Sequence, residues 1–263
     1  MAGDEVFAGG RRAGRAQPGP TGAQNRCLCA ADILRQRAAG VEAAAGGRVE
    51  RARADEQGEN FIGFKVRSDG KDVTPNVELR AYANGLDVTD ESSVERSVGA
   101  LDGYFDMIVV ATGSLGTPEK SLRSFDAPAL ANQIAVNAAG PLLVLKHSAR
   151  FLPRDRRSVF AVLSARVGSI GDNRLGGWYS YRAAKAALNQ LLHTASIEIA
   201  RSHRHAVLAV LHPGTVDTNF TAGYGNEKVP ADVAATRLLS VLNALGPEQS
   251  GGFYDFSGKV VPW

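Results

Sequence analysis

The chain has 263 residues, 44% of them hydrophobic, which is enough for one domain with a sizeable core. Its formal net charge of +3 is too small to indicate nucleic-acid or membrane binding, and no run approaches the roughly 18 apolar residues of a membrane span. Cys27 and Cys29 have no second pair or nearby histidine to complete a zinc site, so we expect neither a disulfide framework nor a metal. We expect a soluble, cytoplasmic protein.

The first sixty residues are rich in arginine and contain no lysine. Residues 17–22 read Gln-Pro-Gly-Pro-Thr-Gly, a sequence that disfavours a helix. An arginine-rich start is typical of an organelle transit peptide, but Asp4, Glu5 and the scarcity of serine and threonine count against one. The glycine-rich stretch 8–16 by itself indicates a loop.

Residues 38–80 mix an alanine-rich, helix-like stretch with turn-like segments at 57–60 and 68–71. A strand is expected over 61–66, and no function can be assigned to this part. From residue 77 the pattern becomes regular, with a strand over 77–82.

A helix is expected after this strand, through Val94, Val98 and Leu101, with Asp87 or Asp90 as its N-cap. The apolar run 105–110 then ends in Ala111-Thr112-Gly113. Small residues after an apolar run are typical of a buried parallel strand that ends beside a ligand.

The remaining elements continue the alternation of helix and strand. The pattern predicts helices over 129–151, 180–201 and 230–245, buried strands over 158–165 and 206–211, and a terminal edge strand over 251–256. This order predicts a single α/β domain, a doubly wound Rossmann-like parallel sheet with helices on both faces. Ligands bind such sheets at the carboxyl ends of strands, where Gly113, Ala165 and Pro213 fall.

Tyr181 and Lys185 are four residues apart in the helix expected over 180–201, so they share one face. Tyr179 is six residues from Lys185 and cannot share that face so closely. An ammonium beside a phenol can lower the phenol's pKa from about 10 toward neutrality. Such a phenol can exchange a proton with a carbonyl or an alcohol.

The motif Tyr181-x-x-x-Lys185, with the phrases at 164–170, 177–182 and 212–218, resembles the short-chain dehydrogenase/reductase superfamily. Within it, the phrases look like the C-factor-like or sniffer-like carbonyl reductase branch. The resemblance covers about residues 86–263. It implies that 77–263 is the Rossmann-like core and that 1–76 is a divergent, partly irregular beginning of the nucleotide-binding fold.

The resemblance also implies a set of site residues. Tyr181 is the expected general acid/base, Lys185 assists it and holds the ribose hydroxyls, and Asn137 opens its helix to hold a relay water. The loop after residue 212 is expected to wrap the nicotinamide, with Val216 near the carboxamide and Thr218 near the amide or phosphate. The cofactor residues implied in this way are Asp87, Val88, Ala111, Thr112, Gly113, Pro213, Gly214, Val216 and Thr218.

Three features depart from the family pattern. The stretch 8–16 has its outer glycines five rather than six residues apart and lacks the middle glycine. Val110 stands where the family has an asparagine. The substrate-orienting serine falls on Ala165, so its hydrogen bond would come from Ser164, from Ser169, or from nothing.

The cofactor prediction is NAD or NADP. Asp32 lies about 20 residues after the glycine stretch, where a ribose-binding acid favours NAD. A carbonyl reductase, by contrast, is expected to use NADPH. The segment 219–228, where a lid is expected, has no distinctive chemistry beyond Phe220 and Tyr224, so the substrate is left open.

The sequence therefore predicts an NAD(P)-dependent oxidoreductase that interconverts a carbonyl and an alcohol. The alternative is a reductase-derived, non-catalytic binding or signalling protein, favoured by Val110, Ala165 and the altered glycine stretch. The expected partners are a small carbonyl or alcohol substrate and further copies of the chain. The resemblance implies a homodimer or homotetramer that pairs through helices 131–152 and 180–201.

Overall fold

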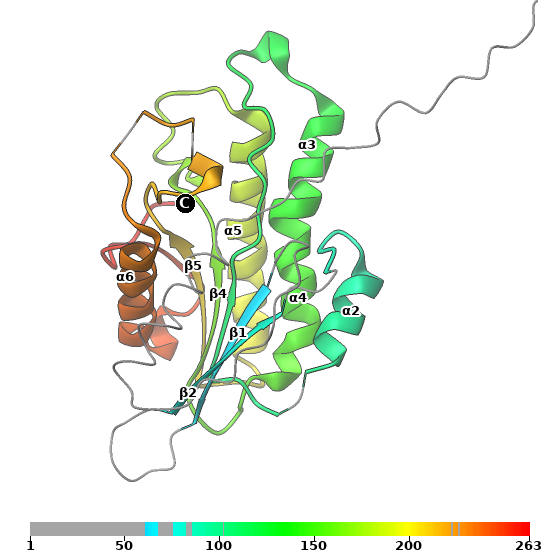
Figure 1. Ribbon diagram of the computed structural model, residues 1–263, viewed down its shortest axis with the longest axis vertical. Helices are drawn as coiled ribbons and strands as arrows, with labels where there is room; N and C mark the ends of the chain where they lie inside the picture. The colour runs from blue at the N-terminus through cyan, green and yellow to red at the C-terminus, as the bar shows by residue number, and fades with distance from the viewer. Residues whose placement is uncertain (1–60, 68–75, 83–85, 102, 222, 226) are drawn as a thin grey trace, which may run out of the picture.

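Among the residues that the computed structural model describes, six strands form one sheet, in the order β2-β1-β3-β4-β5-β6 (Figure 1). The structure describes residues 61–67, 76–82, 86–101, 103–221, 223–225 and 227–263. The glycine-rich stretch 8–16 and Asp32 lie outside the described residues. The strands are β1 (Phe61–Arg67), β2 (Asn76–Tyr82), β3 (Met107–Val110), β4 (Ser158–Leu163), β5 (Ala206–His212) and β6 (Gly252–Asp255).

Strands β3 to β6 run parallel, because each connection between them returns to the starting edge through a helix. The helices are α2 (Glu91–Gly99), α3 (Ala127–Ile134), α4 (Gly140–Ser148), α5 (Tyr179–Ile199) and α6 (Ala231–Ala244). A π-helical turn, Ala135–Ala139, joins α3 to α4. Short 3₁₀ turns span Leu122–Ser124, Ala149–Phe151, Arg166–Gly168, Asn219–Thr221 and Pro247–Gln249.

Helices cover both faces of the parallel strands, as Figure 1 shows. Phe160 and Val162 of β4 face the core formed with α2, α4 and α5, whereas Val159 and Ala161 face α6. Burying a large apolar side chain contributes roughly 1.5–3 kcal/mol, so these two clusters are the main source of stability. The predicted single, doubly wound α/β domain is confirmed.

The hairpin β1–β2 departs from the parallel pattern. β1 pairs antiparallel with both β2 and β3, with Ile62 opposite Val109. The connection between the two hairpin strands, residues 68–75, is too short for the crossover that a parallel pair requires. The predicted strands at 61–66 and 77–82 therefore exist. However, β1 begins at the edge where β3 ends, opposite in direction to the parallel strands.

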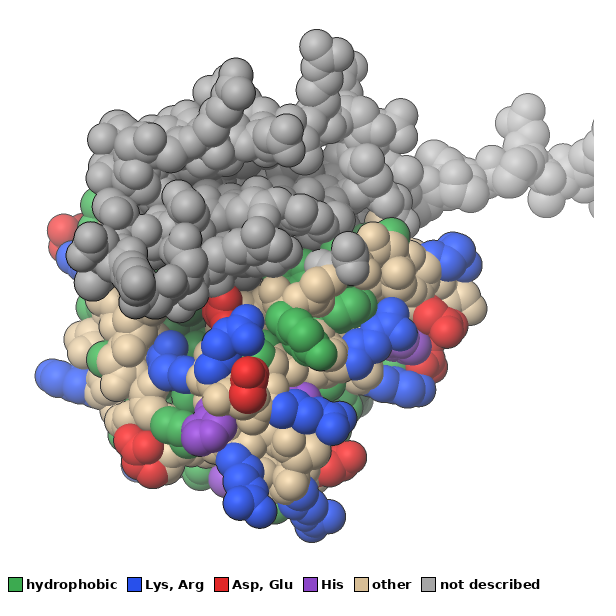
Figure 2. Space-filling model, turned by 90° about the horizontal axis from the view of Figure 1, so that it is seen from below, with side chains coloured by type: hydrophobic (Ala, Val, Ile, Leu, Met, Phe, Trp, Pro, Cys, Tyr) green, Lys and Arg blue, Asp and Glu red, His purple; other side chains and the backbone are tan. Residues whose placement is uncertain are grey.

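In the part of the chain that the structure describes, one helical segment, Ala127–Phe151, is long and apolar enough to cross a membrane by length and composition alone. Its parts pack against α5 and α2 as core elements of the fold. On the coloured part of the face in Figure 2, Lys and Arg side chains are interspersed with Asp and Glu, so that area presents no field of a single sign.

Candidate active site

A cavity of about 460 Å³ opens at the carboxyl ends of β3, β4 and β5, where the sequence placed the ligand site. The predicted residues that line it are Ala111, Thr112, Gly113, Ser164, Tyr181, Lys185, Pro213, Gly214, Val216 and Thr218. Residues from three strand ends and from α5 thus meet in one cavity.

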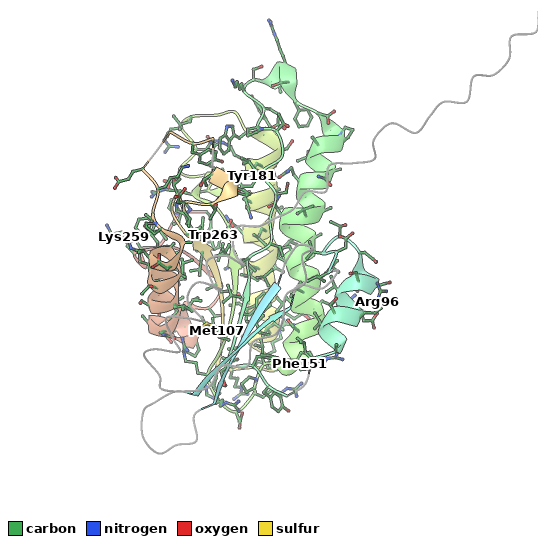
Figure 3. All side chains as sticks on the ribbon, viewed as in Figure 1. Arg96, Met107, Phe151, Tyr181, Lys259 and Trp263 are labelled. Carbon is green, nitrogen blue, oxygen red and sulfur yellow. The ribbon has the colours of Figure 1, made fainter. Side chains whose placement is uncertain are left out.

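Tyr181 and Lys185 lie in the first two turns of α5, and both side chains are buried. The Lys185 Nζ atom lies 5.7 Å from the centroid of the Tyr181 ring and donates to the Leu163 carbonyl oxygen at 3.0 Å. Tyr181 faces the 3₁₀ turn at residues 219–221 (Figure 3), and its ring centroid is 6.2 Å from that of Phe220. Tyr179 is 38% exposed and packs on Phe125, so the tyrosine paired with Lys185 is Tyr181, as predicted.

The turn that enters α5 is strained. Gly176, Gly177 and Trp178 all have positive φ, and Trp178, the N-cap, is left-handed at φ 54° and ψ 40°. A non-glycine residue in this region costs about 1–2 kcal/mol, and such strain persists only where its surroundings enforce it. The Arg182 guanidinium enforces it by donating to the carbonyl oxygens of Gly177 at 3.0 Å and Gly176 at 3.3 Å.

Aromatic rings form one wall of the cavity. The Trp178 ring centroid lies 6.1 Å from that of Tyr181 and 5.8 Å from that of Tyr224. Burial raises the pKa of the Tyr224 phenol, so that hydroxyl is neutral at physiological pH. Tyr224 and Phe220 come from the segment expected to form a lid, and tertiary packing brings them to Tyr181.

Asn137 is fully buried in the π-helical turn, so the helix is widened at this residue, as the resemblance implied. Its Oδ1 atom accepts from the Ser114 backbone N–H at 3.1 Å, and its Nδ2 donates to the Ser114 carbonyl oxygen at 2.8 Å. A Cβ atom added to Gly113 would lie 2.9 Å from Asn137 Oδ1 and 3.5 Å from Lys185 Nζ. A side chain at 113 would therefore push the Asn137 amide away from its bond with Ser114, and Asn137 and Lys185 both border this position.

The serines near Ala165 are engaged elsewhere. The Ser164 hydroxyl donates to Asn189 Oδ1 at 2.7 Å, on the α5 side of the sheet, in agreement with the pleat of the preceding strand. The Ser169 hydroxyl donates to the Pro262 carbonyl oxygen at 2.5 Å and accepts from Asp172 N–H at 3.1 Å. Ala165 itself lines the cavity.

His212 is a cavity residue that the sequence analysis did not assign to the site, although it directly precedes Pro213. Burial lowers the pKa of its imidazole to about 4, with a further lowering by Arg166 and a smaller, opposite effect of Asp255. Its Nδ1 atom faces the Arg166 backbone N–H at 3.3 Å, so the neutral ring carries its proton on Nε2. Arg166 Nε pairs with Asp172 at 2.7 Å.

Glu119 is the second residue that the sequence analysis missed, because a lone glutamate in a loop carries no periodic signal. It is 6% exposed, and its carboxylate accepts from the Ser180 backbone N–H at 3.2 Å and from the Ser180 hydroxyl. Burial raises the pKa of this carboxyl, but the hydrogen bonds from Ser180 and from its own backbone N–H outweigh burial and leave the pKa below its usual value. Glu119 is therefore ionised at neutral pH.

Asp87 and Val88 lie outside the residues that line the cavity. Asp87 is exposed, and its Oδ1 atom accepts from the Thr89 N–H at 2.8 Å and the Thr89 hydroxyl at 2.6 Å, which lower its pKa. Asp90, not Asp87, is the N-cap of α2, through a bond from the Ser92 N–H at 3.0 Å. Val88 is buried against Gly140.

The residues present fit the nicotinamide end of a dinucleotide. Among the described residues, Thr112 Oγ1 is a buried hydroxyl without a hydrogen-bond partner, at the cavity edge. Gly113 leaves room beside it, and Gly214, at φ 79°, turns the loop that follows β5. No group of three or more potential metal-ligating side chains occurs in the described part of the chain.

Comparison with known sequences gives a family match over most of the chain. The family model described as enoyl-(acyl carrier protein) reductase matches residues 51–246. The C-signal of Myxococcus xanthus is 36% identical over 146 residues, 54% of this chain and 84% of the relative. The 1-hydroxy-2-glutathionyl-2-methyl-3-butene dehydrogenase of Rhodococcus sp. (strain AD45) is 32% identical over 184 residues, 68% of this chain and 79% of the relative.

Solved structures share the fold. The carbonyl reductase Sniffer of D. melanogaster superposes with a TM-score of 0.61 at 21% identity, over 67% of this chain and 76% of its own. A short-chain dehydrogenase/reductase from Burkholderia multivorans with bound NADP gives a TM-score of 0.59 at 26% identity, over 68% and 75%. The NADPH-bound carbonyl reductase from chicken fatty liver gives 0.59 at 24% identity, over the same shares.

Proposed function

Because the chain belongs to the short-chain dehydrogenase/reductase superfamily, we propose that it is an NAD(P)-dependent oxidoreductase that interconverts a carbonyl and an alcohol. The observation that carries the proposal is the burial of Tyr181 and Lys185 in one cavity with the strand ends at Ala111–Gly113 and Pro213–Thr218. This arrangement joins a proton donor to the expected nicotinamide end of the site.

A bound nicotinamide supplies or accepts the hydride. In the reducing direction, the Tyr181 hydroxyl donates a proton to the carbonyl oxygen of the substrate, and the Lys185 ammonium stabilises the phenolate left behind. Asn137 Oδ1 and Lys185 Nζ border Gly113, so a relay water held there would return a proton from solvent to Tyr181. The rings of Trp178, Phe220 and Tyr224 exclude water from the reacting carbonyl.

The cofactor residues proposed are Ala111, Thr112, Gly113, Pro213, Gly214, Val216 and Thr218, with Asp87 and Val88 toward the adenine. The stretch 8–16, where the phosphate-binding turn is expected, lacks one residue and the middle glycine of the family pattern. β1 is antiparallel to β3, so its carboxyl end lies at the opposite edge of the sheet and offers no substitute turn beside Gly113. We therefore expect weak nucleotide binding, with a dissociation constant on the order of 1 mM, about 4 kcal/mol weaker than a micromolar site. We place the reaction in the cytoplasm.

Titration of the purified protein with NADH and NADPH tests the cofactor proposal directly. Fluorescence or calorimetry up to several millimolar nucleotide should give saturable binding, and a competition between the two settles which nucleotide is used. Micromolar affinity would show that the phosphate-binding part of the site is intact and would refute the expected weakening. If neither nucleotide binds, the proposed oxidoreductase activity would be refuted.

Paired tyrosine variants test the proton donor. Tyr181→Phe should remove nearly all reductase activity with thermal stability retained, whereas Tyr179→Phe should change turnover less than about twofold, because Tyr179 lies on Phe125 outside the cavity. Equal losses in the two variants would contradict the assignment of Tyr181.

The second candidate is a non-catalytic binding or signalling protein derived from a reductase. Ala165 lines the cavity where the family has its substrate-orienting serine, and both neighbouring serine hydroxyls are engaged elsewhere. The relative from Myxococcus xanthus is named C-signal. Absence of nucleotide binding together with an unchanged phenotype of Tyr181→Phe in the native host would favour this candidate.

A further inference from the structure

Glu119 lies in the segment that leaves β3, between residues 111 and 121, and it does not line the cavity. Its carboxylate is buried and accepts three hydrogen bonds from one residue of α5. Both Oε atoms receive the Ser180 backbone N–H, at 3.2 and 3.3 Å, and Oε1 also receives the Ser180 hydroxyl. Residues 61 positions apart in the chain are joined in this way.

The first turn of α5 needs such an acceptor. The first backbone N–H groups of a helix have no partner within the helix. The N-cap of α5 is Trp178, which among the described residues makes no side-chain cap hydrogen bond. An ionised carboxylate at a helix N-terminus is also favoured by the helix dipole. Glu119 therefore supplies the cap that the local sequence lacks.

The main chain of Glu119 holds the preceding turn as well. Its carbonyl oxygen accepts from the Trp178 N–H at 2.7 Å, and a Cβ atom on Gly177 would lie 3.2 Å from the same oxygen. Glu119 thus holds two positions, Trp178 and Ser180, one on each side of Tyr179, and Ser180 directly precedes Tyr181. The Trp178 ring packs against Tyr181, so a shift of this turn moves the phenol.

The first residues of the segment 111–121 lie on the expected cofactor side of the site. Ala111 to Gly113 line the cavity, and both backbone groups of Ser114 are bonded to the Asn137 side chain. The segment therefore runs from the expected nicotinamide edge and the relay asparagine to the first turn of α5.

We propose that Glu119 is a positioning residue that sets the place of the Tyr181 hydroxyl relative to the cofactor edge of the site, by capping α5 and holding its strained entry turn. The catalytic consequence of this inference rests on the proposed function. The placement of the turn by Glu119 does not, because it can be measured on Trp178 without any activity. Glu119 touches neither the cavity nor the reacting atoms, so it acts through Tyr181.

The kinetic test compares Glu119→Ala and Glu119→Gln with a matched control, Glu198→Gln, an exposed carboxylate on the same helix. With NADPH and 4-nitrobenzaldehyde as probes, Glu119→Ala should lower kcat about 100-fold, the effect of a misplacement near 1 Å. Glu119→Gln keeps a neutral acceptor for the Ser180 N–H but loses the carboxylate charge, so its kcat should fall about three- to tenfold, less than that of Glu119→Ala. The NADPH dissociation constant should stay within twofold in all three, because the cofactor residues are untouched.

Equal activity of Glu119→Ala and the control would overturn the proposal. So would a loss that appears wholly in NADPH binding, or the same kcat in the Ala and Gln variants, since a cap that positions Tyr181 must distinguish them. Circular dichroism confirms that each variant is folded. If Glu119→Ala does not fold, the comparison of Glu119→Gln with Glu198→Gln decides, and no loss of kcat in the former overturns the proposal.

A second readout does not depend on activity. The chain has two tryptophans, so Trp263→Phe leaves Trp178 as the single tryptophan. In that background, with excitation beyond the absorption of the tyrosines, Glu119→Ala should shift Trp178 emission to longer wavelength and increase its quenching by iodide, whereas Glu198→Gln should change neither. Unchanged Trp178 emission would overturn the proposal. A parent protein without reductase activity would refute the proposed function while leaving this test of Glu119 intact.

Discussion

Gly168 separates the loop after β4 from the helix that carries Lys185. An added Cβ atom would lie 2.7 Å from Lys185 Cβ, 2.8 Å from the Lys185 carbonyl carbon and 3.1 Å from the Ala186 nitrogen. Two of these three atoms belong to the α5 backbone, which cannot turn away as a flexible side chain can. In Gly168→Ala, the loop and the helix must therefore separate by about 0.7 Å to reach the 3.4 Å of ordinary contact.

This separation has two measurable consequences. Overpacking of this kind costs about 1–3 kcal/mol. For a chain of this size, each kcal/mol lowers the melting temperature by roughly 2–4 °C. Because the displaced residue is Lys185 itself, a shift approaching 1 Å should also lower kcat/KM by about 10- to 100-fold.

Thermal unfolding by circular dichroism and NADPH-linked reduction of 4-nitrobenzaldehyde measure both effects. Gly223→Ala is the matched control, since a Cβ atom there meets nothing within 4 Å. A Gly168→Ala protein with the activity and melting temperature of the parent would refute the close packing of residues 166–168 on α5 and its role in placing Lys185.

Three further predictions follow from the site. Ala165→Ser should raise turnover about 10- to 1,000-fold if a hydrogen bond to the developing oxyanion is missing. No gain, with loss of activity in Ser164→Ala or Ser169→Ala, would show that another hydroxyl already fills the role. His212 binds a proton below about pH 4 when folded and below about 6.5 when unfolded, so the unfolded state binds more protons between these values and stability falls as the pH falls. Urea unfolding should show His212→Gln losing less stability than the parent over this range, by up to about 3 kcal/mol, and parallel curves would contradict the buried neutral ring. Light scattering at micromolar concentration should give a dimer or tetramer, and a monomer would exclude pairing through residues 131–152 and 180–201.

Local pattern predicted the parallel part of the fold well. Buried strands such as β4 and β5 are continuous apolar runs, and the four-residue spacing of Tyr181 and Lys185 follows from helix geometry alone. Both signals depend on neighbours in the chain. For that reason, the elements from residue 77 onward could be predicted from the sequence, and Tyr181 could be chosen over Tyr179 as the partner of Lys185.

The direction of the hairpin strands β1 and β2, and the strand of the sheet with which β1 pairs, could not be predicted in the same way. The strands at 61–67 and 76–82 were expected, but their antiparallel pairing, and that of β1 with β3, depends on which edge of the sheet is available. The role of Glu119 was equally hidden, because its partner Ser180 is 61 positions away and no periodicity connects them.

The helices, the parallel strands, the Tyr181–Lys185 pair and the absence of a serine at 165 could all be read from the amino-acid sequence, because each is a property of residues within a few positions of one another. Three features became visible only in the folded chain: Ser164 donates to Asn189, His212 lines the cavity as a neutral ring, and Glu119 caps α5. Hydrogen bonds and burial between distant segments depend on the packed arrangement of strands and helices, which local spacing does not specify.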